Sequence, residues 1–539
     1  MEKHSNFIKT IMEEDLKNKK HDTIITRFPP EPNGFLHIGH ARAIIINFEL
    51  AKNFGGYTNL RFDDTNPEKE EEKYVHSIIE DVKWLGYEPK AILYASDYFN
   101  EMYQRALLLI KKGLAYVDDQ SAEEISKTRG TLNTPGLNSP YRNRTVDENL
   151  NLFIKMKEGH FQEGEKVLRA KIDMANPNIN LRDPVIYRIS YEAHHRTKND
   201  WVIYPMYDYA HPLEDAIEGI THSLCSLEFE NHRPIYDWFV KETEMEKIPR
   251  QIEFGRLNIE NTVMSKRYLK VLVDNKIVTG WDDPRLPTLS GLRNRGYTKE
   301  AIKEFILATG LSKTNASVSM AMLESFIRDD LQNKTSKMMA VLDPLKVTIT
   351  NYPDNKIEEI IVPLDQNNPS LGEKTVYFSK HLYIEKDDFI LEKPNKKWKR
   401  LAKDIEVRLF NAYFIKCHDV IYNDKGEIIE LLVTYDEETK SGSGFNKRKP
   451  NGTIHFVSAA KALPATFNLL EPIIFDGEEP LLDRINKNSW QTKQGYVEKA
   501  MENKDEAVQF IRNGYFIRDQ KEKEKLAYHR IVELKSSFK

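Results

Sequence analysis

One stretch of the sequence strongly restricts the local structure that the chain can adopt. It is RFPPEPNGFLHIGH, at residues 27–40. A β-branched run at residues 23–28 leads into it and predicts a buried strand, and an amphipathic run at residues 41–54 follows it and predicts a helix. The cluster of Pro, Asn and Gly between these runs predicts the turn. We therefore expect a strand, a tight turn and a helix that begins near Leu36.

Two histidines, His37 and His40, lie at the predicted N-terminus of this helix. Because they are three residues apart, they share one helix face, beside backbone N–H groups and the positive end of the helix dipole. Such a helix end can hold phosphate, and Gly39 leaves a face without a side chain where a flat ring such as adenine could lie. A lone His-x-x-His is more often half of a metal site or a pair of surface histidines. The Pro-rich approach favours the phosphate interpretation.

A second strand is predicted at residues 58–62 and ends in Asp63, Asp64 and Thr65, before another amphipathic run that predicts a helix. An order of strand, helix, strand and helix predicts a doubly wound parallel sheet. Ligands bind at the carboxyl ends of the strands in such sheets. Asp63, the first residue after the strand, is therefore expected to face the cleft and to meet an ammonium group. Asp64 or Thr65 is expected to cap the following helix.

The chain has an ordinary globular composition, with 539 residues of which 40% are hydrophobic and 30% charged, and this length predicts several domains. Its net charge of -4 gives no whole-chain argument for a nucleic-acid partner, so any basic surface must be local. The two cysteines, Cys225 and Cys417, are far apart, which excludes a disulfide framework and a Cys-rich zinc site. No apolar run reaches the length of a membrane span, and the N-terminus has no signal-peptide pattern, so we expect a cytoplasmic protein.

Four stretches of the chain resemble one enzyme family. TRFPPEPNGFLHIGH, at residues 26–40, resembles the HIGH signature of class I aminoacyl-tRNA synthetases in the form carried by the glutaminyl and glutamyl branch. LRFDDTNP and YPMYDYAHPLEDAIEGITHSLCSLEF are similar to the same branch, and VMSKR, at residues 263–267, resembles the KMSKS loop. Neither HIGH nor a basic tetrapeptide alone is specific for this family. The two motifs in this order, with the intervening signatures present, are specific for it. The resemblance covers residues 23–518.

The resemblance implies an ATP site in the cleft, where His37 and His40 hold phosphates and Lys266 neutralises the leaving pyrophosphate. A basic run is more often a solvated face, but a mobile loop lysine can follow negative charge that develops in a transition state. Threonine is usual where this chain has Ser226, which keeps the hydroxyl and loses a methyl group. The residues that the resemblance assigns to ATP are Glu31, Pro32, Asn33, His37, Gly39, His40, Ser226, Arg256, Leu257, Met264, Ser265 and Lys266.

The resemblance also implies a glutamine pocket made by Arg27, Asp63 and Tyr207. Asp63 would hold the ammonium group. Tyr207 would read the side-chain amide, because a hydroxyl in an otherwise apolar pocket needs such a partner. The use of Arg27 stays open, since its cation could instead meet the carboxylate of glutamate. No protein carboxylate can be assigned to a metal ion from the sequence.

Changes of pattern along the chain predict six segments. After residue 341, short strand-like runs separated by turn residues predict all-β barrels. The segments are an N-terminal tail or charged helix at residues 1–22, the first half of a Rossmann-like catalytic domain at 23–97, an inserted domain for the acceptor end of tRNA at 98–208, the second catalytic half with the MSKR loop at 209–270, a helical domain at 271–338, and two anticodon-binding barrels at 339–539.

Arginines in three of these segments are candidate RNA contacts, although isolated arginines more often carry solvated loop charges. The barrels add basic clusters with an aromatic residue among them, a combination that binds unstacked bases. The candidates are Arg129, Arg142 and Arg144 in the inserted domain, Arg285, Arg293 and Arg295 in the helical domain, and Arg400 and Arg408 in the barrels.

Together these features lead us to expect an α/β enzyme that activates glutamine with ATP and transfers it to tRNA(Gln). We expect a cytoplasmic monomer that uses Mg²⁺ with ATP, needs no organic cofactor or zinc, and binds no membrane. The nearer alternative is a glutamate-charging enzyme of the same branch. The more distant one is a non-catalytic tRNA-binding or regulatory protein on the same scaffold, which would be expected to lack His37, His40 or Lys266, and all three are present.

Replacing Lys266 with alanine is expected to slow adenylate formation by roughly two to three decades, or about 3–4 kcal/mol in the barrier. ATP binding is expected to weaken much less, because the lysine would act mainly on charge that appears in the transition state. Rapid-quench measurement of adenylate formation over a range of ATP concentrations separates the rate from the affinity. Equal losses of both would make Lys266 a ground-state contact.

Overall fold

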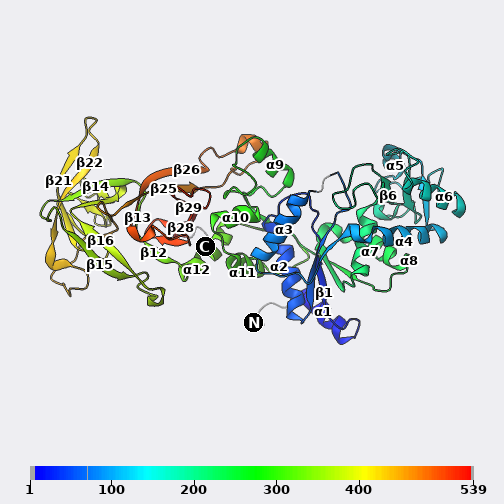
Figure 1. The fold of residues 1–539 in the computed structure, drawn as a ribbon, viewed down its shortest axis with the longest axis horizontal. Coiled ribbons are helices and arrows are strands. Elements are labelled where there is room, and N and C mark those ends of the chain that lie inside the picture. Colours follow the sequence, from blue (N-terminus) through cyan, green and yellow to red (C-terminus); the bar gives the residue numbers. More distant parts are fainter. Residues whose placement is uncertain (1–5, 69–70, 536–539) are drawn as a thin grey trace. The chain divides into compact units, whose positions relative to one another are not determined.

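The computed structural model describes residues 6–68 and 71–535, so the first five residues of the predicted N-terminal segment lie outside it. The chain divides into two compact units (Figure 1). The first unit is Met1–Ile259 with Ile306–Val318, and the second is Glu260–Phe305 with Ser319–Lys539. Within the described ranges, no helix combines the length and the apolar character that crossing a membrane requires.

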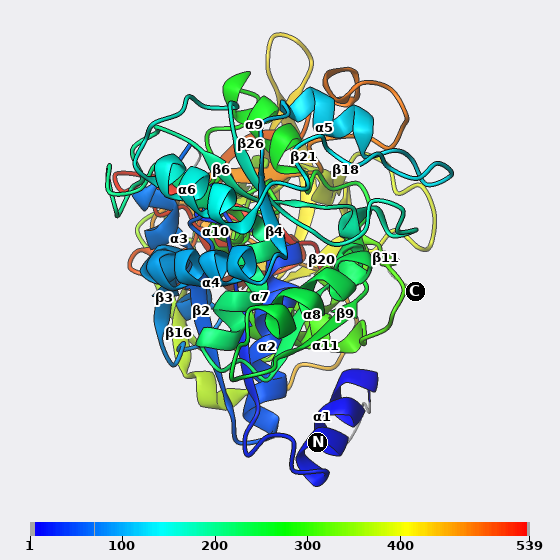
Figure 2. The same ribbon diagram turned by 90° about the vertical axis from the view of Figure 1, so that its right-hand side faces the viewer.

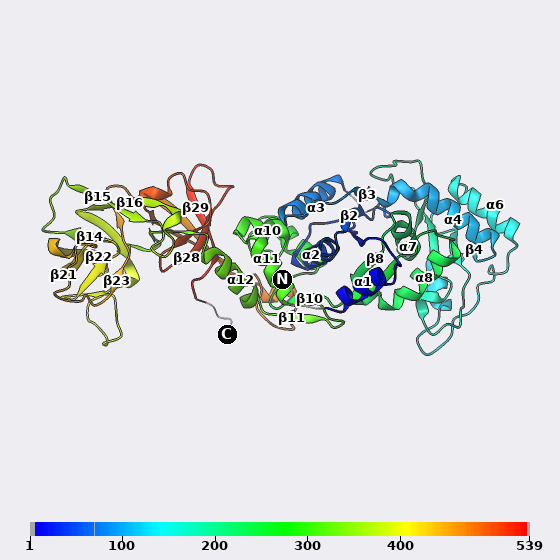
Figure 3. The ribbon, with the colours of Figure 1, turned by 90° about the horizontal axis from the view of Figure 1, so that it is seen from below.

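The first unit contains the predicted strand, helix, strand and helix. They are β1 (Ile25–Phe28), α2 (Ile38–Asn53), β2 (Tyr57–Phe62) and α3 (Glu72–Trp84), followed by β3 (Ile92–Tyr94). The three strands form a parallel sheet in the order β1-β2-β3, and α2 packs along β1 and β2 (Figure 3). The predicted parallel α/β arrangement is confirmed.

Both predicted helices begin further along the chain than the sequence suggested. α2 begins at Ile38 rather than Leu36, because His37 is its N-cap. The N-cap of α3 is Glu71, so the prediction that Asp64 or Thr65 caps this helix is wrong. The side chain of Asp64 is fully buried and bonds to residues far away in the sequence, which local pattern could not reveal.

A second pair of parallel strands, β8 (His222–Ser226) and β9 (Arg250–Phe254), extends the sheet on the other side of β1. The backbone N–H of Thr221 donates to Ile25 O at 2.9 Å, and its hydroxyl accepts from the Ile25 N–H at 2.9 Å. The strand order therefore reverses between β1 and β8, which is the switch point where α/β sheets bind ligands. Helix α7 (Tyr207–Ile217) precedes β8 and α8 (Arg233–Glu242) follows it.

An inserted domain separates the two halves of this sheet. Its core is an antiparallel sheet of four strands in the order β4-β5-β6-β7, with α4 and α6 beside β4 (Figure 2). Its elements are α4 (Phe99–Lys111), β4 (Ala115–Asp118), α5 (Ala122–Thr128), α6 (Val146–Lys157), β5 (Val167–Ala170), β6 (Val185–Ile189) and β7 (Ile203–Pro205).

The sequence predicts either a charged helix or a frayed tail for the N-terminal segment, and the structure has helix α1 (Phe7–Lys17) there. Ile8 and Met12 on this helix are fully buried and share a hydrophobic cluster with Ile24, just before β1. This segment is therefore a packed part of the first unit.

The helices of the region after β9 are α9 (Lys266–Asp274), α10 (Leu289–Arg295), α11 (Lys299–Ala308) and α12 (Met320–Gln332). β10 (Leu257–Ile259), which precedes α9, pairs in parallel with β11 (Ala316–Val318), which lies between α11 and α12. α10 ends at Gly296, whose φ of 91° is left-handed and favours glycine.

Two seven-stranded sheets make up most of the second unit. In the first barrel the order is β23-β20-β21-β22-β14-β17-β24, and its two edge strands are separated in the chain by only His455 and Phe456, so the sheet closes on itself. Its strands are β14 (Pro344–Ile349), β17 (His381–Glu385), β20 (Glu406–Leu409), β21 (Phe414–Tyr422), β22 (Ile428–Asp436), β23 (Thr453–Ile454) and β24 (Val457–Ser458).

The second barrel closes in the same way, with the order β12-β27-β28-β29-β25-β26-β13 and only Met339 between its two edge strands. Both predicted barrels are thereby confirmed, but the second draws its strands from both ends of the region. These are β12 (Ser336–Met338), β13 (Ala340–Val341), β25 (Leu463–Leu470), β26 (Trp490–Val497), β27 (Val508–Phe510), β28 (Gly514–Arg518) and β29 (Leu526–Val532).

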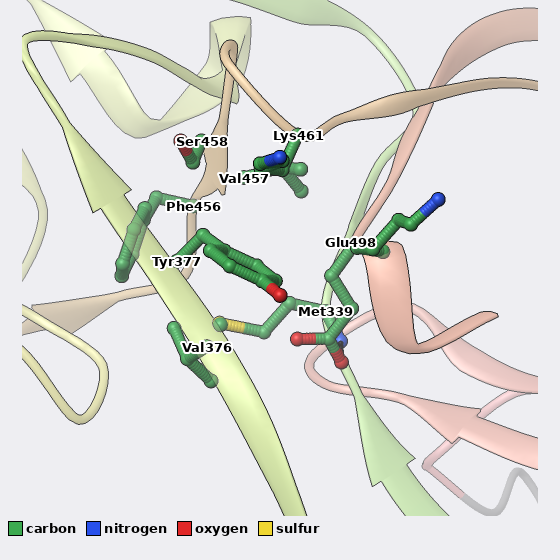
Figure 4. Close-up of a pocket in the computed structure, with 9 residues that line it drawn as sticks. Met339, Val376, Tyr377, Phe456, Val457, Ser458, Lys461 and Glu498 are labelled. Atoms are coloured by element: carbon green, nitrogen blue, oxygen red, sulfur yellow. Dashed lines mark hydrogen bonds between the residues drawn. The ribbon is translucent and has the colours of Figure 1, made fainter. Parts of the chain in front are cut away.

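The two barrels meet around a small pocket lined by Met339, Tyr377, Phe456 and Glu498 (Figure 4). The carboxylate of Glu498 accepts from the Met339 N–H at 2.8 Å and from the buried Lys374 Nζ at 2.5 Å. Lys374 and Tyr377 lie on β16 (Glu373–Ser379), which pairs with β15 (Ile357–Pro363). A buried ion pair thus joins this hairpin to the second barrel.

Candidate active site

Three buried charged side chains from separate elements meet near the carboxyl ends of β1 and β2. Arg27 on β1 and Arg61 on β2 both donate to Asp215 on α7, with Nε and Nη1 each 2.8 Å from Oδ1. All three side chains are fully buried. Burial alone would raise the pKa of Asp215, but the charge of Arg27 and its neighbours brings that pKa well below its ordinary value. The ionised carboxylate therefore ties two strands to one helix.

The guanidinium of Arg27 is engaged on every side. Its Nη1 donates to Leu224 O and its Nη2 to Ser223 Oγ, both at 2.8 Å. Nη2 also lies 2.7 Å from His211 Nε2, and burial lowers the pKa of His211 to about 3, so this ring is neutral near pH 7. Because Asp215 already balances its charge, Arg27 is poorly placed to serve as the counter-ion of a glutamate carboxylate.

Acidic groups outnumber guanidinium groups in this buried region. Glu214 Oε2 lies 2.9 Å from Arg61 Nε, and Glu218 Oε2 lies 3.1 Å from Arg61 Nη1. Burial raises the pKa of both glutamates. A raised pKa favours the neutral form of each carboxyl group, and a cation nearby would favour the ionised form.

Asp63 follows β2 directly and is 7% exposed. Its backbone N–H donates to Pro30 O at 3.1 Å, and its carboxylate accepts from the hydroxyl of Thr65 at 2.9 Å. Burial, together with the negative charge of Glu31, raises the pKa of Asp63 to about 6. An ammonium group beside it would favour the ionised form, as the sequence prediction requires.

Tyr207 begins α7 and stacks on His211, with ring centroids 5.0 Å apart and planes 16° from parallel. A small cavity beside its ring is also lined by Phe229 and Gln251. Burial raises the pKa of the Tyr207 hydroxyl well above its ordinary value, so the hydroxyl keeps its proton. A neutral hydroxyl can both donate and accept, which suits a side-chain amide.

The N-terminus of α2 is capped by its own histidine rings. His37 Nδ1 accepts from the Gly39 N–H at 3.0 Å, and His40 Nδ1 accepts from the His37 N–H at 3.1 Å. We therefore assign the ring proton of each neutral histidine to Nε2. Burial, with the positive charge of Arg256, lowers the pKa of His37 to about 4. The backbone N–H groups of His37 and Gly39 are thus already engaged, and the holding of phosphates by the two rings stays a prediction.

The predicted ATP residues Ser226 and Arg256 are joined through one carboxylate. Ser226, at the end of β8, donates to Glu228 Oε1 at 2.8 Å, and Arg256 pairs with the same oxygen. The charge of Arg256 also acts on His37, so this pair lies near the N-terminus of α2. Of the other predicted ATP residues in this unit, Pro32 and Leu257 are buried, Glu31 is exposed, and Asn33 and Gly39 are half-buried.

The MSKR residues belong to the second unit. Ser265 is the N-cap of α9 and Lys266 is its first residue, so the predicted loop lysine instead begins a helix. Met264 is half-buried, and Ser265 and Lys266 are exposed. A positive side chain is unfavourable at a helix N-terminus, so the charges of Lys266 and Arg267 do not favour α9, and the role of Lys266 toward phosphate stays a prediction. The alignment of Lys266 with His37 stays a prediction.

The arginines predicted to contact RNA from the inserted domain differ in their surroundings. Arg142 donates through Nε to the buried Asp183 at 2.6 Å, and Arg144 makes two bonds to Asp119, at 2.8 and 2.7 Å. Arg129 is exposed. The first two arginines therefore hold the inserted domain together, and an RNA contact from any of the three stays a prediction.

The two candidate RNA contacts in the barrels, Arg400 and Arg408, also differ in their surroundings. Arg408 Nη1 donates to Thr439 O at 3.0 Å and to Ser441 Oγ at 2.9 Å, so it holds a loop of the first barrel. Arg400 is partly exposed, and its guanidinium lies 5.5 Å from the ring centroid of Trp398. Such a cation and aromatic pair suits an unstacked base, and both RNA contacts stay predictions.

In the helical segment, the predicted RNA contacts Arg285 and Arg295 bond to the C-terminal part of the chain. Arg285 Nη1 donates to Ser489 Oγ at 3.0 Å, and Arg295 Nε donates to Ile531 O at 3.1 Å. Arg293 is half-buried in the last turn of α10. Arg285 and Arg295 thus join the helical segment to the second barrel, and RNA binding by the three stays a prediction.

Asp64, His194 and His195 form a cluster whose possible metal-ligand atoms all lie within 4.8 Å of one another. His194 Nδ1 accepts from the backbone N–H groups of Arg196 and Thr197 at 3.2 and 3.1 Å, so its Nε2 carries the proton and donates to Asp64 O at 2.7 Å. A ring nitrogen must give up its proton to bind a metal ion, and Mg²⁺ prefers oxygen ligands. The cluster therefore does not fit the Mg²⁺ expected with ATP and is a hydrogen-bonded network.

Several residues that support the pocket were missed from the sequence. His211 and Asp215 are four residues apart on α7, and this spacing predicts a shared helix face. Arg61 lies in the stretch LRFDDTNP, in which the sequence predicts a role for Asp63 alone. For His194 no local signal connects it to the site, because its partner Asp64 is far away in the sequence.

The chain matches three family models in succession. Residues 23–333 match the catalytic domain of tRNA synthetases class I (E and Q). Residues 336–436 and residues 453–519 each match an anti-codon binding domain of tRNA synthetases class I (E and Q). The last two ranges contain most strands of the two barrels.

Curated relatives match over nearly the whole chain. The glutamine–tRNA ligase of Clostridium perfringens is 57% identical over 547 residues, which covers 100% of this chain and 99% of the relative. That of Clostridioides difficile is 58% identical over 546 residues, covering 99% of this chain and 98% of the relative. A solved glutamate tRNA ligase from Elizabethkingia meningosepticum covers 57% of this chain and 70% of its own, at 19% identity and a TM-score of 0.43.

The apparent affinity for the amino acid is expected to fall as pH drops below about 6, because protonation of Asp63 removes the charge that meets the ammonium group. At pH 5 the value of kcat/KM for glutamine should be about tenfold lower than at pH 7. Steady-state aminoacylation over this range, at saturating ATP and tRNA, measures the effect. The pKa of His37 is about 4 and that of His211 about 3, so neither ring titrates in this window. An Asp63→Asn variant should lose this pH dependence, and a wild-type profile without an inflection near 6 would contradict the assignment.

Proposed function

This chain belongs to the class I tRNA synthetases of the E and Q group, and we propose that it activates glutamine with ATP and joins it to tRNA(Gln). The observation that carries the proposal is the identity of 57% and 58% to glutamine–tRNA ligases over essentially the entire chain. A match of this extent includes the catalytic sheet, the inserted domain and both barrels, so the proposal concerns the complete reaction.

In the proposed first step, a carboxylate oxygen of glutamine attacks the α-phosphate of ATP. A new oxygen–phosphorus bond forms as the bond to pyrophosphate breaks, and the products are glutaminyl-adenylate and pyrophosphate. No side-chain nucleophile is needed, because alignment and stabilisation of phosphate charge lower the barrier. His37 and His40 would donate from Nε2 to phosphate oxygens, and Lys266 would neutralise the leaving pyrophosphate.

The pocket around Tyr207 favours glutamine over glutamate. A hydroxyl that keeps its proton can bond to either end of an amide. A glutamate carboxylate would need a cation, and the nearest candidate, Arg27, is buried and already paired with Asp215 at 2.8 Å. Asp63 would hold the ammonium group in either case, so the choice between the two substrates depends on Tyr207 and Arg27.

In the proposed second step, a ribose hydroxyl at the 3′ end of tRNA attacks the carbonyl carbon of the adenylate, and AMP leaves. The inserted domain would hold the acceptor end of the RNA. The two barrels would bind the anticodon, which is supported by their match to anti-codon binding domains. Of the candidate base contacts, Arg400 beside Trp398 has the more suitable exposure.

We further expect the protein to act as a monomer in the cytoplasm. Mg²⁺ would be bound chiefly by the phosphates of ATP, because magnesium sites of this kind use substrate oxygens and few protein ligands. When bound, Mg²⁺ would screen the negative charge of the ATP phosphates.

The test of the proposal is aminoacylation of purified tRNA with radiolabelled glutamine and glutamate in parallel. We expect attachment of glutamine to tRNA(Gln) and no attachment of glutamate. Attachment of glutamate instead would identify the glutamate-charging alternative. RNA binding without attachment of either amino acid would identify a non-catalytic protein.

Glutamine-dependent exchange of pyrophosphate into ATP is expected to be negligible without tRNA and to appear when tRNA is added. Enzymes of the resembled branch are similar in this requirement. The physical reason would be induced fit, in which RNA binding energy shifts the pocket around Asp63 and Tyr207 toward a competent state. The measurement uses RNase-treated enzyme with and without added tRNA. Robust exchange without tRNA would indicate a preformed pocket.

A further inference from the structure

A turn of the inserted domain reaches the carboxyl end of β2. The turn, residues 194–198, lies in the connection between β6 and β7 and is closed by backbone bonds of 2.9 and 3.0 Å between His194 and Lys198. We call it the His194 turn. Its histidines contact Asp64, the residue next to Asp63. A segment outside the nucleotide-binding sheet therefore touches the neighbour of the proposed ammonium ligand.

The ring of His194 holds the backbone of Asp64. The ring is fully buried, with centroids 5.6 Å from Phe99 and 6.1 Å from Tyr204. Because its Nδ1 accepts from two backbone N–H groups of the turn, its Nε2–H is the donor to Asp64 O, at 2.7 Å. This carbonyl lies within residues 63–66, which follow β2 and form neither strand nor helix, so the ring supplies a bond that no strand or helix provides.

The side chain of Asp64 is held by three donors. Its carboxylate accepts from the Ser96 N–H at 2.8 Å, from the Ser96 hydroxyl at 2.7 Å and from His195 Nε2 at 3.0 Å. Arg196 Nη1 donates to Ser96 Oγ at 2.6 Å, which leaves the hydroxyl proton for Asp64. Ser96 follows β3, so this fully buried carboxylate connects β2, β3 and the turn.

We propose that the His194 turn positions Asp63 through Asp64, so that His194 and His195 are positioning residues for the amino-acid pocket. The backbone is held on both sides of the Asp63 side chain. The N–H of Asp63 donates to Pro30 O at 3.1 Å, and His194 donates to the carbonyl of the next residue. Without the His194 donor, the buried Asp64 carbonyl would lose its partner and the stretch would shift to recover one. A displacement of about 1 Å at a binding group can cost as much as 100-fold in rate.

The inference rests on the proposed function and is tested with His194→Phe and His194→Gln. Phenylalanine keeps a buried ring without a donor, whereas glutamine can place an N–H near the position of Nε2. In aminoacylation assays at saturating tRNA, His194→Phe should raise the KM for glutamine at least about tenfold, with the KM for ATP within about twofold of wild type. His194→Gln should recover most of the loss.

The matched control is His222→Phe, because His222 is also fully buried and hydrogen-bonded in the first unit, at 2.9 Å from Thr221 Oγ1. Thermal unfolding should show a lower Tm for both phenylalanine variants, with an unchanged KM for glutamine only in the control. A lower Tm without a change in the KM for glutamine in His194→Phe would overturn the proposal. So would an equal rise of the KM for glutamine and for ATP.

Two further measurements cover the case in which His194→Phe does not fold. Ser96→Ala and His195→Ala each remove one donor to Asp64, and each should raise the KM for glutamine severalfold. Adding His195→Ala to Asp63→Asn should have no further effect on that KM, because the turn would act only through Asp63. Additive effects, or an unchanged KM in both alanine variants, would overturn the proposal. If the wild-type protein charges no glutamine, the proposed function fails instead.

Discussion

Asp215 is the group on which the arrangement of the catalytic unit depends. Its carboxylate accepts from Arg27 and Arg61 on neighbouring strands, from Ser223 at 2.6 Å on β8 and from Tyr236 at 2.8 Å on α8. One buried charge thus fixes the two sides of the switch point relative to each other. Loss of one partner from a buried ion pair typically costs about 3–5 kcal/mol, because the other charge is left without compensation. The same pairing that orders the sheet also balances the charge of Arg27, the cation that the sequence offered for a glutamate carboxylate.

The cleft divides into two halves with different electrostatics. On the side of the predicted nucleotide site, the rings of His37 and His40 cap α2, and burial lowers the pKa of His37 to about 4, so the His37 ring is neutral near pH 7. On the side of the predicted amino-acid pocket, burial and the charge of Glu31 raise the pKa of Asp63 to about 6, and a cation beside it would favour the ionised form. A substrate that is anionic at one end and cationic at the other therefore has one favourable orientation.

Much of this molecule follows from local sequence pattern. The strand and turn around the HIGH stretch, the strand that delivers Asp63 and the short strands of the barrels all show in residue order. Local sequence pattern does not predict a contact between side chains that are far apart in the chain. Asp64 was expected to cap a helix, but Ser96 and His195 engage its carboxylate. Likewise no feature near Arg142 in the sequence indicates its bond to Asp183, and its candidate RNA contact stays a prediction. Which strands would close each barrel was equally hidden, because strand pairing joins distant residues.

The interleaving of the two barrels in the chain has a consequence for biosynthesis. The second barrel needs β12 and β13, made early, together with strands that run to Val532, whereas the first barrel is complete once Ser458 has been made. A chain leaving the ribosome can therefore close the first barrel while β12 and β13 still lack partners. These short strands must wait through the synthesis of the whole first barrel, and their unpaired edges are exposed for that time. The C-terminal strands thus complete the second barrel, whose first two strands are made before any strand of the first barrel. A ribosome that stops after Ser458 but before the C-terminal strands leaves the first barrel closed and the second open.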